Sequence, residues 1–172
     1  ARILDITEMV TEYAPGYEKF INEAFLFTAN FHTGQFRSSG QPYISHPLEV
    51  GLMLAEMKQD PETIAAGLLH DTLEDTRATK NEINESFGEI TANLVDGVTK
   101  LNRLDVPNTR TRQAENYRKM LVAMSDDIRV IIIKLIDRLH NAMTLEYLPN
   151  EAKKRIALET QEVYAPLANR LG

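Results

Sequence analysis

The segment 61–76, PETIAAGLLHDTLEDT, constrains the fold of this chain more than any other part of the sequence. Its small and apolar residues have the length of a buried helix. Asp60 and Pro61 are typical of a helix start, because aspartate caps the first turn and proline has no amide hydrogen to lose there. Two leucines then lead directly into His70 and Asp71. An unpaired carboxylate among leucines is costly, so the fold has to supply a partner for it.

The acids at the end of this segment point the same way. On a continuous helix Glu74 lies four residues after His70, and Asp75 four residues after Asp71, so the four groups share one rim. Acids near the C-terminal end of a helix also meet the negative end of its dipole, which indicates a compensating cation nearby. A cluster that holds a cation and keeps carboxylates to manage water is the arrangement that metal-assisted hydrolysis needs.

The spacing of apolar residues is helical along nearly the whole chain. Helices are expected over 16–32, from His46 onward, over 61–76, over 79–88, over 128–141 and over 150–164, with a further amphipathic stretch over 111–124. The segment 128–141 is rich in Ile and Val, but its length, its cap residues and the lack of a partner strand favour a buried helix. Loops are expected at 33–43 and 102–111. The sequence therefore predicts a single compact all-α domain over residues 1–172.

Composition excludes several classes of protein. The chain has 172 residues, 43% of them hydrophobic, which is enough to bury a core in one domain. No apolar run approaches the roughly 20 residues that span a bilayer, and the first residues of the given sequence do not show a signal-peptide pattern. A net charge of −6 argues against binding nucleic acid or an anionic membrane, but it permits a small polyanionic substrate beside a bound cation. The absence of cysteine excludes thiolate ligands and disulfides, and we expect an intracellular, cytoplasmic protein.

Polar residues enter the predicted apolar helices at three places. His46 stands at a helix start, His70 and Asp71 follow two leucines, and Asp137 follows an almost entirely apolar run. One cation satisfies all four side chains, whereas the competing interpretation needs a separate salt bridge for each, for example from Lys134 to Asp137. Two imidazoles and two carboxylates suit manganese, iron or zinc better than magnesium or calcium. For the remaining histidines, His32 and His140, structural roles are expected, with His140 as an alternative partner of a ligand.

A series of motifs then carries a resemblance over practically the whole chain. They read HTGQFRSSGQPYISHP at 32–47, LLHDTLEDT at 68–76, DGVTKL at 96–101, ENYRKM at 115–120, IKLIDRLHN at 133–141 and YAPLANRLG at 164–172. In this order they resemble the hydrolase domain of the RelA/SpoT-type bifunctional alarmone synthetase/hydrolase family, which is part of the wider HD metal-dependent phosphohydrolase superfamily.

The resemblance implies an HD-domain helical bundle that removes pyrophosphate from the 3′ position of guanosine tetra- and pentaphosphate, ending the stringent response. It implies one manganese ion per site, held by His46, His70, Asp71 and Asp137. The paired catalytic acids of the family fall on Glu74 and Asp75. The positions expected to bind substrate are Arg37, Asn141, Thr144 and Lys100. In long family members a synthetase domain follows the position of Gly172, so we expect a domain excised from a longer chain.

One departure from the family keeps two alternatives open. The family usually has Met-Arg-Thr after Asn141, whereas this chain has Ala142, Met143 and Thr144, so a cation near the pocket is missing. One alternative is a related phosphohydrolase that acts on the 2′-phosphate of NADPH. Another is a regulatory domain that binds the alarmone without hydrolysing it, against which the retained Glu74-Asp75 pair weighs.

Overall fold

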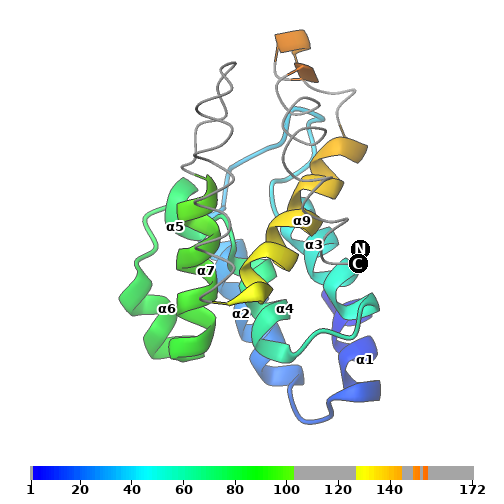
Figure 1. The fold of residues 1–172 in the computed structure, drawn as a ribbon, viewed down its shortest axis with the longest axis vertical. Coiled ribbons are helices and arrows are strands. Elements are labelled where there is room, and N and C mark those ends of the chain that lie inside the picture. Colours follow the sequence, from blue (N-terminus) through cyan, green and yellow to red (C-terminus); the bar gives the residue numbers. More distant parts are fainter. Residues whose placement is uncertain (1, 103–126, 145–148, 152, 155–172) are drawn as a thin grey trace.

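The computed structural model describes residues 2–102, 127–144, 149–151 and 153–154. Within these ranges the regular structure is helical, apart from one isolated pairing between Phe36 and Pro42. The helices shown in Figure 1 are α1 (Ile3–Tyr13), α2 (Glu18–Phe31), α3 (Ser45–Glu56), α4 (Pro61–Leu69), α5 (Thr72–Asp75), α6 (Lys80–Phe87), α7 (Glu89–Asn102) and α9 (Ile128–Met143). The all-α fold class is confirmed. The predictions over 102–111, 111–124 and 150–164 lie wholly or mostly outside the described residues.

Several helix boundaries follow from the capping residues. Asp60 is the N-cap of α4 with Pro61 at its first position, as predicted. At α6 the predicted capping box is present, since Thr79 accepts from the Glu82 amide and the Glu82 side chain accepts from the Thr79 amide. The same helix ends at Gly88, whose φ of 91° is readily adopted by glycine.

Two helices and one helix break differ from the prediction. Helices α1 and α7 have no counterpart among the predicted helices, although Ile3, Ile6 and Val10 repeat at helical spacing in α1. The predicted helix over 61–76 is divided into α4 and α5 at His70 and Asp71. Both residues keep right-handed helical dihedral angles, so the break between α4 and α5 is short and the backbone stays close to a helical path.

Helix α4 is the centre of the fold. It packs against α2, α3, α7 and α9, and nearly all of its residues are buried. Its small residues allow this close packing, since a Cβ added at Gly67 would lie 2.5 Å from Leu54 Cδ1 of α3. A similar approach joins α7 to α9, where a Cβ at Gly97 would lie 2.8 Å from a γ-methyl of Val130. The small residues of α4 and α7 therefore let neighbouring helices approach closely around the helix that leads into His70.

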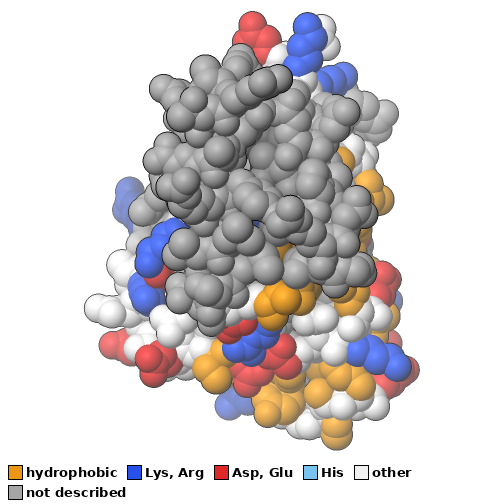
Figure 2. Space-filling view, in the orientation of Figure 1, with side chains coloured by type: hydrophobic (Ala, Val, Ile, Leu, Met, Phe, Trp, Pro, Cys, Tyr) orange, Lys and Arg blue, Asp and Glu red, His pale blue; other side chains and the backbone are white. Residues whose placement is uncertain are grey.

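The surface carries charges of both signs. In Figure 2 the described part of the visible face shows acidic and basic side chains interspersed with apolar ones. Among the described helices, none combines the length and the apolar character that a membrane crossing requires.

Candidate metal centre

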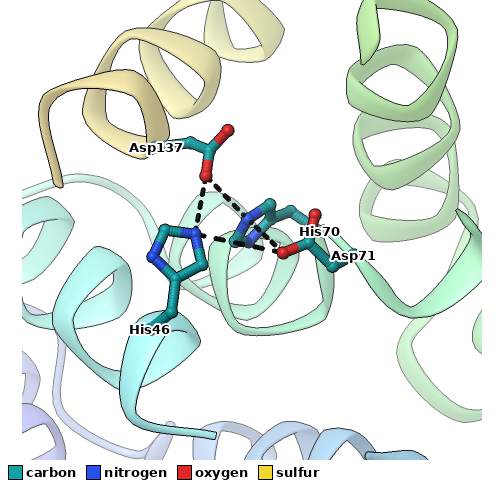
Figure 3. A group of neighbouring side chains, drawn as sticks. All are labelled: His46, His70, Asp71 and Asp137. Carbon is teal, nitrogen blue, oxygen red and sulfur yellow. Dashed lines mark hydrogen bonds and ion pairs between the residues drawn. The ribbon is translucent and has the colours of Figure 1, made fainter. Parts of the chain in front are cut away.

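Four buried side chains from three helices meet at the end of α4. His46 comes from the first turn of α3, His70 and Asp71 from the junction between α4 and α5, and Asp137 from α9 (Figure 3). One potential ligand atom of each lies within 4.8 Å of the others. We call these four residues the His/Asp cluster. All four are buried, and the most exposed, Asp71, is 8% exposed.

The nitrogen and oxygen atoms of the cluster face one another closely. Asp137 Oδ1 lies 2.6 Å from His46 Nε2 and 3.1 Å from His70 Nε2. Asp71 Oδ2 lies 3.0 Å from His70 Nε2 and 3.9 Å from His46 Nε2. Each imidazole therefore presents the same atom, Nε2, to a carboxylate oxygen.

The other nitrogen of each imidazole has a partner of its own. His70 Nδ1 lies 2.6 Å from the carbonyl oxygen of Gly67, which can only accept a hydrogen bond. His46 Nδ1 lies 2.6 Å from Nδ1 of His140, and these two rings are stacked. Burial, followed by the charges of His46 and Arg37, lowers the pKa of His140 to about 4, so its ring is neutral at pH 7 and can accept a hydrogen bond from His46. The tautomers that carry the hydrogen on Nδ1 of His46 and His70 leave Nε2 of these two rings available to bind a metal ion.

The charges of the cluster also favour a cation. Burial alone would raise the pKa of Asp71, but the neighbouring His70 outweighs it and lowers the pKa to about 2. Burial is likewise outweighed at Asp137, where the charges of Lys134 and His70 hold the pKa well below its usual range. Burial lowers the pKa of His70, yet the carboxylates of Asp71 and Asp137 raise it well above its usual value. Two ionised carboxylates thus hold a proton on His70 that a metal ion can replace.

The salt bridge from Lys134 is also present, but it occupies a different oxygen. Lys134 Nζ lies 2.9 Å from Asp137 Oδ2, while Oδ1 of the same carboxylate faces both imidazoles. Asn141 Nδ2 also reaches Asp137 Oδ1, at 3.4 Å. The two interpretations of Asp137 therefore hold together: one oxygen is paired with a lysine and the other belongs to the cluster. The donor set fits a divalent metal ion bound by nitrogen and oxygen.

The acids of the α5 helix lie beside the cluster and reach solvent. Asp75 is exposed, and its Oδ2 lies 3.5 Å from the hydroxyl of Tyr43, which also donates a hydrogen bond to Asp71 Oδ2. Partial desolvation and the negative charges of Asp71 and Glu74 raise the pKa of Asp75 to about 6. Glu74 is exposed too, and its Oε2 accepts a hydrogen bond from Asn102 at 3.1 Å.

The loop before α3 brings a cation to the C-terminal end of α9. The guanidinium of Arg37 donates to Asn141 Oδ1 at 3.4 Å and to Thr144 Oγ1 at 3.2 Å. Asn141 connects this group to the His/Asp cluster through its contact with Asp137. Lys100 is elsewhere: it is exposed on α7, and its Nζ pairs with Asp96 at 3.0 Å.

Comparison with known proteins identifies the family to which this chain belongs. A family model described as HD domain matches residues 24–172. The chain belongs to the HD-domain family. Its His70-Asp71 pair supplies half of the buried cluster.

Curated relatives of this HD domain are much longer than it is. It is 51% identical over 167 residues to a GTP pyrophosphokinase of Myxococcus xanthus, covering 95% of this chain and 22% of the relative. It is 49% identical over 168 residues to the bifunctional (p)ppGpp synthase/hydrolase SpoT of Escherichia coli K12, covering 97% of this chain and 24% of the relative. The chain thus spans about a quarter of the length of these relatives and matches the RelA/SpoT family named from its motifs.

A solved structure shares the fold of the HD domain. It matches with a TM-score of 0.67 and 27% identity, covering 83% of this chain and 82% of the other. Its title describes a metazoan ortholog of SpoT that hydrolyzes ppGpp. The predicted HD-domain helical fold is confirmed.

The structure of the HD domain also shows contacts beside the cluster that the sequence pattern alone does not reveal. Tyr43 lies in the motif at 32–47, where the sequence predicts no role for it, and its hydroxyl contacts both Asp71 and Asp75. His140 was expected to be structural or the partner of a ligand, and it is the partner of His46. No periodicity marks Tyr43, because it lies in a loop, so only the fold reveals what its hydroxyl contacts.

Proposed function

We propose that this chain is a metal-dependent 3′-pyrophosphohydrolase that converts guanosine 3′,5′-bis(diphosphate), or the pentaphosphate, to GDP, or GTP, and pyrophosphate. The observation that carries the proposal is the buried His/Asp cluster with Asp75 exposed directly beside it. The names of relatives support the choice of substrate. A protein of Escherichia coli O157:H7 named guanosine-3′,5′-bis(diphosphate) 3′-pyrophosphohydrolase is 49% identical over 168 residues.

The metal is assigned to the four residues of the cluster: His46, His70, Asp71 and Asp137. We propose manganese, which the resemblance to the RelA/SpoT-type family implies. The mixed imidazole and carboxylate donors suit manganese, iron or zinc better than calcium or magnesium. When bound, such an ion supplies a Lewis acid to a phosphoryl oxygen and favours the ionisation of water.

The acids beside the cluster handle protons. With a pKa of about 6, Asp75 is ionised at neutral pH yet basic enough to accept a proton from the attacking water. Glu74, fixed by the Asn102 amide, orients that water together with Asp75. The water oxygen bonds to the phosphorus attached to the 3′ oxygen, and the bond from that phosphorus to the 3′ oxygen breaks. The proton that Asp75 took from the water passes to the 3′ oxygen as pyrophosphate leaves.

Substrate phosphates are assigned to the group around Arg37. Its guanidinium is held by Asn141 and Thr144 and so is ready to pair with phosphate oxygens without further ordering. Lys100 is proposed as an additional phosphate contact, for which its Asp96 partner would have to release it.

The protein context is part of the proposal. The curated relatives are about four times as long as this chain, which supports an adjoining synthetase domain in a longer polypeptide. We propose that the enzyme acts in the cytoplasm and binds neither nucleic acid nor membrane through this domain.

Chromatography of reaction products tests the proposal. Metal-free protein is loaded with Mn²⁺ and incubated with guanosine tetraphosphate, and in parallel with NADPH. Manganese-dependent GDP and pyrophosphate are expected from the first substrate. Asp5→Asn, which changes a partly exposed aspartate on α1 away from the cluster, serves as the control for Asp75→Asn and should keep full turnover. Inorganic phosphate from NADPH alone would favour the alternative hydrolase, and tight binding of guanosine tetraphosphate without any product would favour the regulatory domain.

A further inference from the structure

The hydroxyl of Tyr43 lies between two carboxylates that have different proposed roles. It donates to Oδ2 of Asp71, the same oxygen that lies 3.0 Å from His70 Nε2. On its other side, Oδ2 of Asp75 lies 3.5 Å away. One phenol thus connects a residue of the His/Asp cluster to the proposed proton acceptor.

The position of this phenol is fixed from several sides. Its ring packs on the imidazole of His32, with centroids 4.6 Å apart and planes 31° apart. Its amide donates to the carbonyl oxygen of Gln35 at 2.9 Å. The side chain of Gln35 contacts His32 Nδ1 at 3.0 Å and donates to the backbone oxygen of Asp75 at 3.2 Å. The loop therefore holds Tyr43 and α5 in register with each other.

Two neighbouring carboxylates that are both ionised repel each other, and each is free to rotate about its last bond. A hydroxyl hydrogen shared between them is attracted to both carboxylates, which reduces the repulsion and limits the rotation of the groups that accept it. Outer groups of this kind orient the ligands of metal sites and set how tightly the metal binds.

We propose that Tyr43 is a positioning residue that orients Asp71 toward the metal and keeps Asp75 beside it. This inference deepens the proposed function and rests on it for the role of Asp75. The competing account is that Tyr43 only packs on His32. The two accounts separate in Tyr43→Phe, which keeps the ring and removes the hydroxyl.

The test is a titration of metal-free protein with Mn²⁺ alone, following free Mn²⁺ by electron paramagnetic resonance. Tyr43→Phe should bind Mn²⁺ about 10- to 100-fold more weakly than the wild type. The control is Tyr13→Phe, whose hydroxyl donates to the backbone oxygen of Gln59 at 2.7 Å, and its affinity should equal that of the wild type. Unchanged affinity in Tyr43→Phe would overturn the proposal.

A kinetic readout separates this inference from the proposed function. At saturating Mn²⁺ the kcat of Tyr43→Phe for guanosine tetraphosphate should fall while KM stays near the wild-type value, since Arg37 is untouched. A change in KM with an unchanged kcat would count against a positioning role. Wild-type protein that binds Mn²⁺ without hydrolysing guanosine tetraphosphate would overturn the proposed function, and the Mn²⁺ titration would still decide the role of Tyr43 toward Asp71.

Discussion

Helices α4 and α9 are joined by charged groups at two places, and the two junctions differ. At the start of the helices, Arg129 pairs with Asp60 at 3.0 Å and with Asp127 at 2.7 Å. We call these three residues the Arg129 clamp. Further along the same helices, His70 and Asp137 belong to the His/Asp cluster.

The difference lies in the positive partner. Hydrogen bonding to Asp127 raises the pKa of Arg129 still further, so the clamp keeps its cation at any physiological pH. In the cluster, part of the positive charge is a proton on His70, which a metal ion can displace. The aspartates of the Arg129 clamp and those of the His/Asp cluster therefore have different roles at two places along the same pair of helices. One junction fixes the helices, and the other remains open to exchange.

The largest effect is expected from removing a ligand of the cluster. Asp71→Asn should weaken Mn²⁺ binding by more than about 100-fold, beyond the usual cost of losing an outer partner, and abolish hydrolysis. Metal content after dialysis measures the loss. Asp127→Asn in the Arg129 clamp is the matched control and should retain its metal. Full Mn²⁺ occupancy in Asp71→Asn would remove Asp71 from the ligand set.

Asp75→Asn should separate metal binding from turnover. The amide cannot accept the proton from water, so kcat should fall by about 10²- to 10⁴-fold. Mn²⁺ affinity should stay within a few-fold of the wild type, because the Asp75 side chain contacts the cluster through the Tyr43 hydroxyl and is not itself a proposed ligand. Steady-state kinetics and the Mn²⁺ titration are measured on the same preparation. Unchanged kcat would show that another group accepts the proton.

Removing the cation of the clamp should affect stability alone. Arg129→Met leaves Asp60 and Asp127 without their guanidinium and should lower the free energy of unfolding by about 1–2 kcal/mol, between the values typical of exposed and buried pairs. Urea unfolding of metal-free protein measures the change. Arg2→Met, which breaks the exposed pair with Asp5, should stay within about 0.5 kcal/mol of the wild type. A large loss of Mn²⁺ affinity in Arg129→Met would mean that the two junctions are coupled.

The smallest effect is a pH dependence of stability in metal-free protein. The pKa of Asp75 in the folded chain is about 6, above its ordinary value, so the folded state binds this proton more tightly than the unfolded state. The stability from this group is present at about pH 4 and is lost as the pH rises through about 6. Asp75→Asn should therefore gain Tm relative to the wild type between these two pH values.

Asp5 provides a control of opposite sign for that pH dependence. A hydrogen bond from the backbone of Arg2 lowers the pKa of Asp5, so its stability is present at neutral pH and lost in acid. Asp5→Asn should accordingly lose Tm relative to the wild type as the pH rises. Thermal unfolding at about pH 4 and about pH 7 measures both variants. Parallel changes in the two variants would contradict the pKa assigned to Asp75.

Much of the fold follows from local rules that the sequence displays. Asp60 with Pro61 and the Thr79 capping box mark helix starts because their chemistry acts within one turn. The buried helix over 128–141 was predicted from its length and caps, and α9 extends it to Met143. The all-α class follows from the same local signals.

What the sequence could not provide depends on contacts between distant segments. The two oxygens of Asp137 serve different partners, and this division is decided by the orientation of α9 against α3 and α4. The break at His70 and Asp71 is also unmarked in the sequence, since neither position is a proline or a glycine. The hydroxyl of Tyr43 reaches two carboxylates 28 and 32 residues away, which no periodicity encodes.

The separation of the cluster residues along the chain bears on kinetics as well as on affinity. His46 and Asp137 are 91 residues apart, so their side chains meet only after α9 has docked. A metal ion that needs both therefore stabilises the folded state more than the folding transition state. We expect Mn²⁺ to slow unfolding and leave the refolding rate nearly unchanged, which stopped-flow measurements in urea would show. Bound Mn²⁺ would then prolong the lifetime of the folded state, although the chain folds without the ion.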